Sequence, residues 1–392
     1  MKKTYRHLIL LFILISLIAG ISSTTPASNK GVIIHFLDVG QADSTLIQLP
    51  NNRNILIDAG NNDDGSTIVN YLKNKNIDTI VYIIGTHPHE DHIGGLDNVI
   101  DSFKIGKIYL PKIVHNTKTF EDLLMAIHRK KKKIITARAA VNIINEDNLK
   151  IFFISPLKAN YQELNHYSAV VKLEYHNSSF LFTGDAEVIN EEDILEEYKE
   201  ISKSNLLKVG HHGSISSTSN QFLNNVDPEY AIISVGKDNS YGHPSPVIIK
   251  RLNNKGIKIY RTDQQGTIIA SSDGNNITFN VDPVTYTALP TKDSGIIIES
   301  VDLHKEVLTI KNKSDRKFDL TDWKLLSVNG SQEYIFPRET ILNPGDYIKI
   351  ISGPNAISKN AKTLIWTKSY IWNNNGDIAE LYDKDDNLIS RY

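Results

Sequence analysis

Three histidines and an aspartate stand within six consecutive positions of the stretch GTHPHEDHIGG, residues 85–95. These side chains are His87, His89, Asp91 and His92. Neutral imidazole together with carboxylate is a donor set that suits Zn²⁺, Mn²⁺ or Fe²⁺. His87 and His89, two positions apart, can present both imidazoles to one ion, while Asp91 and His92 can turn toward a neighbouring position. A solvated polar loop is the alternative, and the density of ligands disfavours it. The stretch therefore predicts a metal site.

The rest of the composition narrows the chemistry. The chain has no cysteine, which excludes thiolate ligands and cysteine nucleophiles. It also lacks the Gly-x-Ser-x-Gly pattern of serine hydrolases. A hydrophobic content of 40% and a charged content of 22% are ordinary for a folded globular protein. The formal net charge of −2 provides no overall basic field, so composition alone does not indicate a nucleic-acid partner. Metal-assisted hydrolysis is the expected reaction class.

The ligand cluster follows a predicted strand. The run TIVYIIGTH, residues 79–87, is short, rich in Ile and Val and leads directly into the motif. Loops at the carboxyl ends of strands are where open α/β folds place their sites. Similar apolar runs, bounded by Gly, Asn or Pro, recur through residues 31–283. Helical patterns come between them at residues 120–127, 187–198 and 246–253. We expect an α/β layered domain that ends near residue 283.

The N-terminus has the pattern of an export signal. Lys2, Lys3 and Arg6 precede an apolar run at residues 8–19, which a small, polar stretch follows. This pattern predicts a signal peptide over residues 1–28 and a secreted or cell-surface protein. The alternative is an uncleaved membrane anchor, although the run is shorter than the roughly 20 residues of a spanning helix. No later segment approaches that length, so we expect no integral membrane domain beyond the signal segment.

Six stretches, the histidine motif among them, carry a family resemblance. In chain order they are FLDVGQADSTLIQLP (36–50), NILIDAG (54–60), THPHEDHIGG (86–95), FLFTGDAE (180–187), LLKVGHHGS (206–214) and YGHPSP (241–246). Together they resemble the metallo-β-lactamase-fold hydrolases, and within these the ComEC/Rec2-type subgroup. The resemblance spans residues 31–283 and implies an αββα sandwich of four layers. The subgroup includes the soluble C-terminal domain of a DNA-uptake channel protein, and this chain resembles a free-standing, exported version of that domain.

The resemblance implies a role for each ligand. His87 and His89 would hold a first ion, and Asp91 and His92 a second. Asp185, at the end of the strand SSFLFTGD, would bridge both ions. The cofactors implied are therefore two divalent metal ions, Zn²⁺ or Mn²⁺.

A histidine of VGHHGS, residues 209–214, would complete the second site. His211, directly after the glycine, is the expected ligand, and His212 is left as a metal or substrate contact. Asp58 in LIDAG resembles a buried acid that orients the histidine loop and fixes imidazole tautomers. It joins Asp91 in the expected catalytic machinery.

This sequence departs from the wider superfamily at one ligand. The usual third histidine on the first ion should lie between Asp91 and Asp185. The stretch found there, LNHYSAV at residues 164–170, fits the subgroup's Asn-x-x-Ser pattern instead. Asn165 is therefore expected in that place, with His166 as the alternative if the loop shifts by one residue. A weaker first site makes Mn²⁺ as suitable as Zn²⁺.

Three features bear on the substrate. His243, in YGHPSP, matches a subgroup motif and is assigned to substrate phosphate binding or catalytic proton transfer. Ser214 can donate a hydrogen bond to substrate or cap the next helix. The basic run Arg129–Lys133 can hold a phosphate backbone or be a solvated helix end.

The expected function is an exported nuclease or phosphodiesterase that acts on DNA through hydroxide activated by two metal ions. A small-molecule metallohydrolase, acting on a lactam, lactone or ester, is the alternative, because fold and ligands do not identify the substrate. A non-catalytic protein that binds the cell envelope or nucleic acid is the second alternative.

The last hundred residues have a different character. Residues 284–294 are polar and aperiodic and predict a linker, while residues 295–392 predict short strands between turns, typical of a β-sandwich. The stretches at 318–327, 334–350 and 371–389 resemble a lamin-tail domain, which is an immunoglobulin-like sandwich. Attached to an exported hydrolase, such a domain implies a cell-envelope or nucleic-acid partner.

Overall fold

The computed structural model describes residues 31–286, 294–327, 332–358, 360–372, 377 and 379–392. The predicted signal peptide, residues 1–28, lies outside the described residues, as do residues 287–293 of the predicted linker. Within the described ranges no helix combines the length and the hydrophobicity that crossing a bilayer requires.

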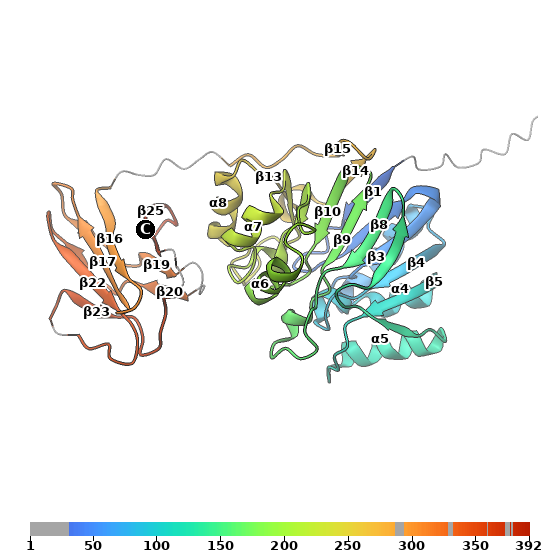
Figure 1. Ribbon diagram of the computed structural model, residues 1–392, viewed down its shortest axis with the longest axis horizontal. Helices are drawn as coiled ribbons and strands as arrows, with labels where there is room; N and C mark the ends of the chain where they lie inside the picture. Colours follow the sequence, from blue (N-terminus) through green and yellow to red (C-terminus); the bar gives the residue numbers. More distant parts are fainter. Residues whose placement is uncertain (1–30, 287–293, 328–331, 359, 373–376, 378) are drawn as a thin grey trace, which may run out of the picture.

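Two large sheets form the first part of the chain (Figure 1). The first sheet has the strand order β15-β14-β1-β2-β3-β4-β5-β6, and the second has the order β13-β12-β11-β10-β9-β8-β7. The strands of the first sheet are β1 (Val32–Phe36), β2 (Thr45–Leu49), β3 (Arg53–Ile57), β4 (Thr79–Ile84), β5 (Lys104–Leu110), β6 (Ile134–Thr136), β14 (Ile268–Ser272) and β15 (Ile277–Phe279). Those of the second are β7 (Asn142–Glu146), β8 (Leu149–Phe153), β9 (Val171–Tyr175), β10 (Ser178–Phe182), β11 (Leu206–Lys208), β12 (Tyr230–Ile233) and β13 (Lys258–Arg261).

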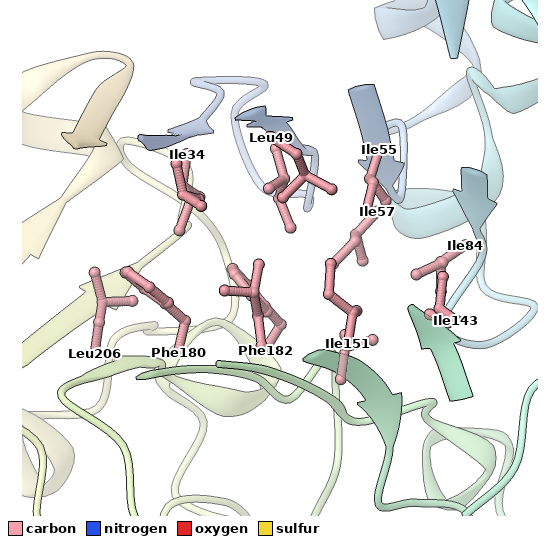
Figure 2. Close-up of a cluster of buried hydrophobic side chains, with 14 of the residues drawn as sticks. Ile34, Leu49, Ile55, Ile57, Ile84, Ile143, Ile151, Phe180, Phe182 and Leu206 are labelled. Atoms are coloured by element: carbon pink, nitrogen blue, oxygen red, sulfur yellow. The ribbon is translucent and has the colours of Figure 1, made fainter. Parts of the chain in front are cut away.

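The two sheets pack face to face across an apolar core. Figure 2 shows side chains from both sheets meeting between them, with Ile34, Leu49 and Ile57 from the first sheet opposite Ile151 and Phe182 from the second. Each of these residues is buried. Burial of this apolar area is the main force that holds two sheets together.

Helices cover the outer face of each sheet. A second core joins the first sheet to α2 (Gly65–Asn74), α4 (Leu96–Ser102) and α5 (Lys118–Arg129). A third core joins the second sheet to α6 (Val188–Glu197), α7 (Asn220–Val226) and α8 (Pro246–Asn254). Two one-turn helices, α3 (Glu90–Ile93) and α9 (Thr262–Gln265), complete the set. The result is the predicted αββα sandwich of four layers (Figure 1).

The C-terminal part is all-β, as predicted. In the described residues it has two four-stranded sheets, β16-β17-β22-β23 and β20-β19-β24-β25, and a two-stranded sheet, β18-β21. They surround one core that includes Trp323, Phe336 and Trp372. The strands are β16 (Ile296–Asp302), β17 (Val307–Asn312), β18 (Phe318–Asp319), β19 (Lys324–Ser327), β20 (Gln332–Ile335), β21 (Ile341–Leu342), β22 (Tyr347–Ile351), β23 (Thr363–Ile365), β24 (Ala379–Tyr382) and β25 (Leu388–Arg391).

The two parts of the chain are in contact. Val247 of α8 packs with Leu326 of β19 and Tyr382 of β24 in a small buried cluster, and Figure 1 shows the C-terminal sandwich beside α7 and α8. The first part also continues into the predicted linker, because Val284 pairs with Ile259 of β13 and the Tyr286 hydroxyl accepts a hydrogen bond from Arg261.

Candidate metal centre

The predicted ligands follow the carboxyl ends of four strands, which form two parallel pairs, β3–β4 and β10–β11. Asp58 directly follows β3, the histidine motif follows β4, Asp185 follows β10, and the pair His211–His212 follows β11. In layered α/β folds the carboxyl ends of the strands form the binding edge, because the loops that leave them can converge there. The sequence thus positions its chemistry on loops that a rigid scaffold anchors.

The loop after β4 also packs closely against its neighbours. Gly94, at the end of α3, has no room for a side chain, since a Cβ there would lie 2.3 Å from backbone atoms of Asn61 and Asn62. This close approach holds the histidine motif against the loop that leaves β3.

One group of ligand atoms forms what we call the second metal position. Its members are Asp91, His92, Asp185 and His212, whose candidate ligand atoms all lie within 4.8 Å of one another. His92 Nε2 lies 3.2 Å from Asp185 Oδ1, and His212 Nε2 lies 3.2 Å from Asp91 Oδ2 and 3.7 Å from Asp185 Oδ1. The structure therefore groups His212 with Asp91 and His92, where the sequence analysis had placed His211.

The ring of His211 points away from the second metal position because of the backbone angles of the dipeptide His211–His212. His211 and His212 both have left-handed backbone angles, with φ of 48° and 53°. Such angles are uncommon outside glycine and need support from the surrounding fold. They separate the two rings, whose centroids lie 6.2 Å apart. Nε2 of His211 consequently lies 3.6 Å from Oδ2 of Asp185, the oxygen on the other side of the carboxylate.

What we call the first metal position lies at Oδ2 of Asp185, beside His87 and His89. Nε2 of His87 lies 3.9 Å from Asp185 Oδ2 and 3.0 Å from Nδ1 of His89. Two nitrogens bound to one tetrahedral Zn²⁺ at about 2.0–2.1 Å would stand about 3.3 Å apart. The pair His87 and His89 is therefore spaced as two ligands of one ion would be.

The residues at the second metal position fit a cation. His92 Nε2 and Asp185 Oδ1 are both buried, and apart from their 3.2 Å approach to each other neither has a hydrogen-bond partner among the described residues. Orphaned polar atoms of this kind are costly in a folded interior. Burial alone would lower the pKa of His92, but the carboxylates of Asp185, Asp91 and Asp58 outweigh it and raise that pKa well above its usual value. The same surroundings favour a bound divalent ion.

Asp58 lies where an orienting acid would lie. Its carboxylate accepts hydrogen bonds from the backbone N–H of Thr86 at 2.8 Å, from the Thr86 hydroxyl at 2.7 Å and from Nδ1 of His92 at 2.8 Å. Because Nδ1 of His92 is the donor in this contact, Nε2 of the neutral ring would have its lone pair directed toward Asp185 and free for a metal ion. Outer contacts of this kind fix the tautomer and direction of metal-binding histidines.

Asp43 and Lys208 belong to the same surroundings, and neither was predicted from the sequence. Asp43 Oδ2 lies 2.6 Å from Lys208 Nζ, and Asp43 Oδ1 lies 3.5 Å from Nδ1 of His212. Both side chains are buried. The available signal was Lys208 itself, a charged residue inside the apolar run LLKV, which must find a buried partner.

Glu187 is a third residue that the sequence analysis missed. Its carboxylate accepts from Ser216 Oγ at 2.9 Å and from the side-chain amide of Asn165 at 3.3 Å, and it lies 3.0 Å from His166 Nε2. Burial alone would raise the pKa of Glu187, but its hydrogen bonds to His211, Ser216, Asn165 and His166 lower that pKa to about 2. Asn165 and His166, the two expected replacements for the third histidine, thus both contact Glu187.

His243 lies at the edge of the centre. Its ring is 5.7 Å from that of His211 and stacks on Tyr241, whose side chain is exposed. Nδ1 of His243 is buried without a partner in the described part of the chain. Burial lowers the pKa of His243 to about 4, so the ring is neutral at pH 7. A pocket of about 290 Å³ is lined by Ser214, Tyr241 and His243 together with residues of the C-terminal sandwich.

The basic run Arg129–Lys133 lies away from these residues. It begins at Arg129, the last residue of α5, a helix of 12 residues and roughly 18 Å. Arg129 pairs with Asp101, and Lys130 Nζ donates to the Asp101 carbonyl. These contacts favour a solvated helix end.

Fold and site together define the class of protein. Residues 37–237 match the metallo-beta-lactamase superfamily, and residues 290–392 match the lamin tail domain. The chain belongs to the metallo-β-lactamase superfamily and carries a lamin tail domain.

Within that superfamily its relatives are of the ComEC/Rec2 type. The chain is 30% identical over 273 residues to ComE operon protein 3 of Bacillus subtilis, a match that covers 65% of this chain and 35% of that protein. It is 30% identical over 255 residues to competence protein ComA of Neisseria gonorrhoeae, covering 64% and 34%. It is 28% identical over 237 residues to recombination protein 2 of Haemophilus influenzae, covering 59% and 28%. The chain thus spans about a third of the length of these relatives.

Proposed function

We propose that this chain is a metal-dependent nuclease or phosphodiesterase that acts on DNA at a site for two divalent ions, Zn²⁺ or Mn²⁺. The observation that carries the proposal is the division of Asp185 between two groups of nitrogen ligands. Oδ1 of Asp185 faces His92 and His212, while Oδ2 faces His87 and His211. A carboxylate between two such groups suits a two-metal centre, an arrangement widely used for displacement at phosphorus.

The chain's own residues have distinct tasks in this proposal. Two ions bound at the centre would supply Lewis acidity and activate water for attack. Asp58 holds the second-position histidine through His92 Nδ1. His243, neutral at pH 7, and the hydroxyl of Ser214 line a pocket next to His211 and would donate hydrogen bonds to phosphate oxygens.

Support for DNA comes from the relatives. The metallo-β-lactamase fold serves many hydrolytic reactions, so the fold itself does not select a substrate. The ComEC/Rec2-type relatives favour a DNA-related role for this chain. The exposed ring of Tyr241, next to His243, offers a face on which a base can stack.

The test is a nuclease assay on the chain without residues 1–28, the predicted signal peptide. Plasmid and single-stranded DNA are incubated with the protein and Mn²⁺ or Zn²⁺, beside an Asp91→Ala variant. We expect cleavage that needs the metal and that the variant loses. If neither DNA is cut while a lactam, lactone or ester is hydrolysed, the small-molecule alternative replaces the proposal. Binding of DNA without hydrolysis of any substrate would favour the non-catalytic alternative.

We also propose that residues 1–28 direct export, so that the protein acts outside the cytoplasm, and that the lamin tail domain contacts the cell envelope or nucleic acid. Fractionation of cells that express the full chain tests the first point. Recovery of the protein in the cytoplasm, with its N-terminus intact, would reject export.

A further inference from the structure

The first metal position has fewer strong ligands than the wider superfamily provides there. His87, His89 and Asp185 supply three donors. The stretch LNHYS, expected to supply the fourth, does not do so through His166, whose Nε2 is engaged by Glu187 at 3.0 Å. Asn165 donates its amide N–H to Glu187, and its buried Oδ1, which has no hydrogen-bond partner among the described residues, could offer only a weak oxygen donor. A further imidazole from another part of the chain would restore the nitrogen ligand that the wider superfamily has on this ion.

His211 approaches the same oxygen of Asp185 as His87 does. Its Nε2 lies 3.6 Å from Asp185 Oδ2, the same oxygen that lies 3.9 Å from Nε2 of His87. Its neighbour His212 faces the opposite oxygen, Oδ1. The left-handed angles at both residues produce this division, and a hydrogen bond from the backbone N–H of His211 to Gly184 at 3.0 Å fixes the position of His211 beside the strand end that carries Asp185.

The other ring nitrogen of His211 has the partner that a metal ligand needs. Nδ1 lies 3.2 Å from Oε1 of Glu187 and 3.2 Å from the hydroxyl of Ser216. Since a carboxylate can only accept, Nδ1 carries the proton and Nε2 keeps its lone pair toward Asp185. A carboxylate behind a histidine is the arrangement that commonly orients metal-binding imidazoles. Asp58 and His92 form the corresponding pair at the second metal position.

We propose that His211 completes the first metal position in place of the superfamily's third histidine, and that Glu187 is its positioning residue. The proposal rests on the metal centre of the proposed function and not on its substrate. Glu187 also binds the amide of Asn165, whose Oδ1 is buried without a hydrogen-bond partner in the described residues. One carboxylate therefore contacts both His211 and Asn165.

Metal counting on the purified full chain tests the proposal without any substrate. The protein is loaded with Mn²⁺, passed through gel filtration and analysed for bound metal, with circular dichroism to verify folding. We expect two equivalents in the wild type and one in His211→Ala. Retention of two equivalents by folded His211→Ala would overturn the proposal.

Double variants identify which ion His211 binds. If His87 and His211 hold the same ion, the variant His87→Ala/His211→Ala still retains one equivalent, and the variant His92→Ala/His211→Ala retains none. The reverse pattern would assign His211 to the second metal position and reject the proposal.

A matched pair of variants tests Glu187 as a positioning residue. Glu187→Gln should keep both ions but bind one of them about 10–100-fold more weakly in a Mn²⁺ titration. Glu192→Gln, the same substitution at an exposed residue of α6, should bind both ions as the wild type does. Unchanged affinities in Glu187→Gln, or an equal loss in Glu192→Gln, would overturn the role of Glu187. Because DNA is absent, none of these results depends on whether the protein is a nuclease.

Discussion

His211 and His212 are consecutive in the chain, yet their Nε2 atoms approach different oxygens of one carboxylate. His211 Nε2 lies 3.6 Å from Asp185 Oδ2, and His212 Nε2 lies 3.7 Å from Asp185 Oδ1. The left-handed backbone at both positions makes this possible. A single dipeptide thereby contributes to both metal positions, and its two imidazoles have different second partners: Glu187 and Ser216 for His211, and the Ser234 carbonyl for His212.

Replacement of Asp58 should weaken the second metal position. In Asp58→Asn one carboxylate oxygen becomes an amide donor, so at least one of the contacts with Thr86 and His92 is lost. We expect the Mn²⁺ affinity of one site to fall about 10–100-fold, with the other site unchanged. Isothermal titration measures both sites. Asp64→Asn, at a carboxylate that accepts from Asn61, is the control. Equal titration curves for the wild type and Asp58→Asn would refute an orienting role.

Two buried lysines should respond differently to the loss of their charge. Lys208→Met leaves the buried carboxylate of Asp43 without its 2.6 Å partner, and removing one member of a buried ion pair costs about 3–5 kcal/mol. Lys172 is also buried, but its Nζ donates to Ser204 Oγ and to the Lys203 carbonyl, and burial lowers its pKa to about 8.

Lys172→Met should therefore cost less than Lys208→Met, because it removes an unfavourably buried charge. Denaturant unfolding of both variants at pH 7 measures the difference, which we expect to be at least about 2 kcal/mol. Equal losses would show that the charge of Asp43 is compensated without Lys208.

Acid should destabilise the fold through His35. This strand residue, which the sequence analysis did not assign to the site, is buried between the Tyr71 hydroxyl and Gln48. Burial lowers the pKa of His35 from 6.5 to about 4. Between these pH values the unfolded chain binds more protons, so the free energy of unfolding rises with pH through this window and falls again on acidification. The contribution of His35 reaches about 3 kcal/mol above pH 6.5.

His35→Gln keeps a polar side chain at that position and removes the titration. Its free energy of unfolding should depend less steeply on pH between 4 and 6.5 than that of the wild type, as measured by urea unfolding across the range. Parallel pH profiles for the two proteins would contradict a depressed pKa at His35.

The layers of the fold could be predicted because local patterns agree with the tertiary structure. The predicted helices at residues 120–127, 187–198 and 246–253 correspond to α5, α6 and α8, whose buried faces follow the helical period. The apolar strands are buried between a helix layer and a second sheet. The contacts of Val284 and Tyr286 with the first part could not be predicted, because they depend on partners elsewhere in the sequence.

The candidate site could be predicted only in part. His87, His89 and Asp91 stand together in one motif, so their convergence needs a single loop. The separation of His211 from His212 depends on backbone angles that no residue type indicates, since neither is a glycine. The contact of Glu187 with the site could not be predicted either, because a glutamate at the start of a predicted helix is ordinarily a solvated or capping residue. Its role follows from partners at Asn165 and His211.

The central claim is that Asp185 lies between two metal positions, and its most direct test is the metal content of Asp185→Asn. Both proteins are loaded with Mn²⁺, passed through gel filtration and analysed by mass spectrometry for bound metal. We predict two equivalents in the wild type and fewer than one in folded Asp185→Asn, because the substitution weakens both positions at once. A wild-type protein with fewer than one equivalent, or a variant that retains two, would contradict it.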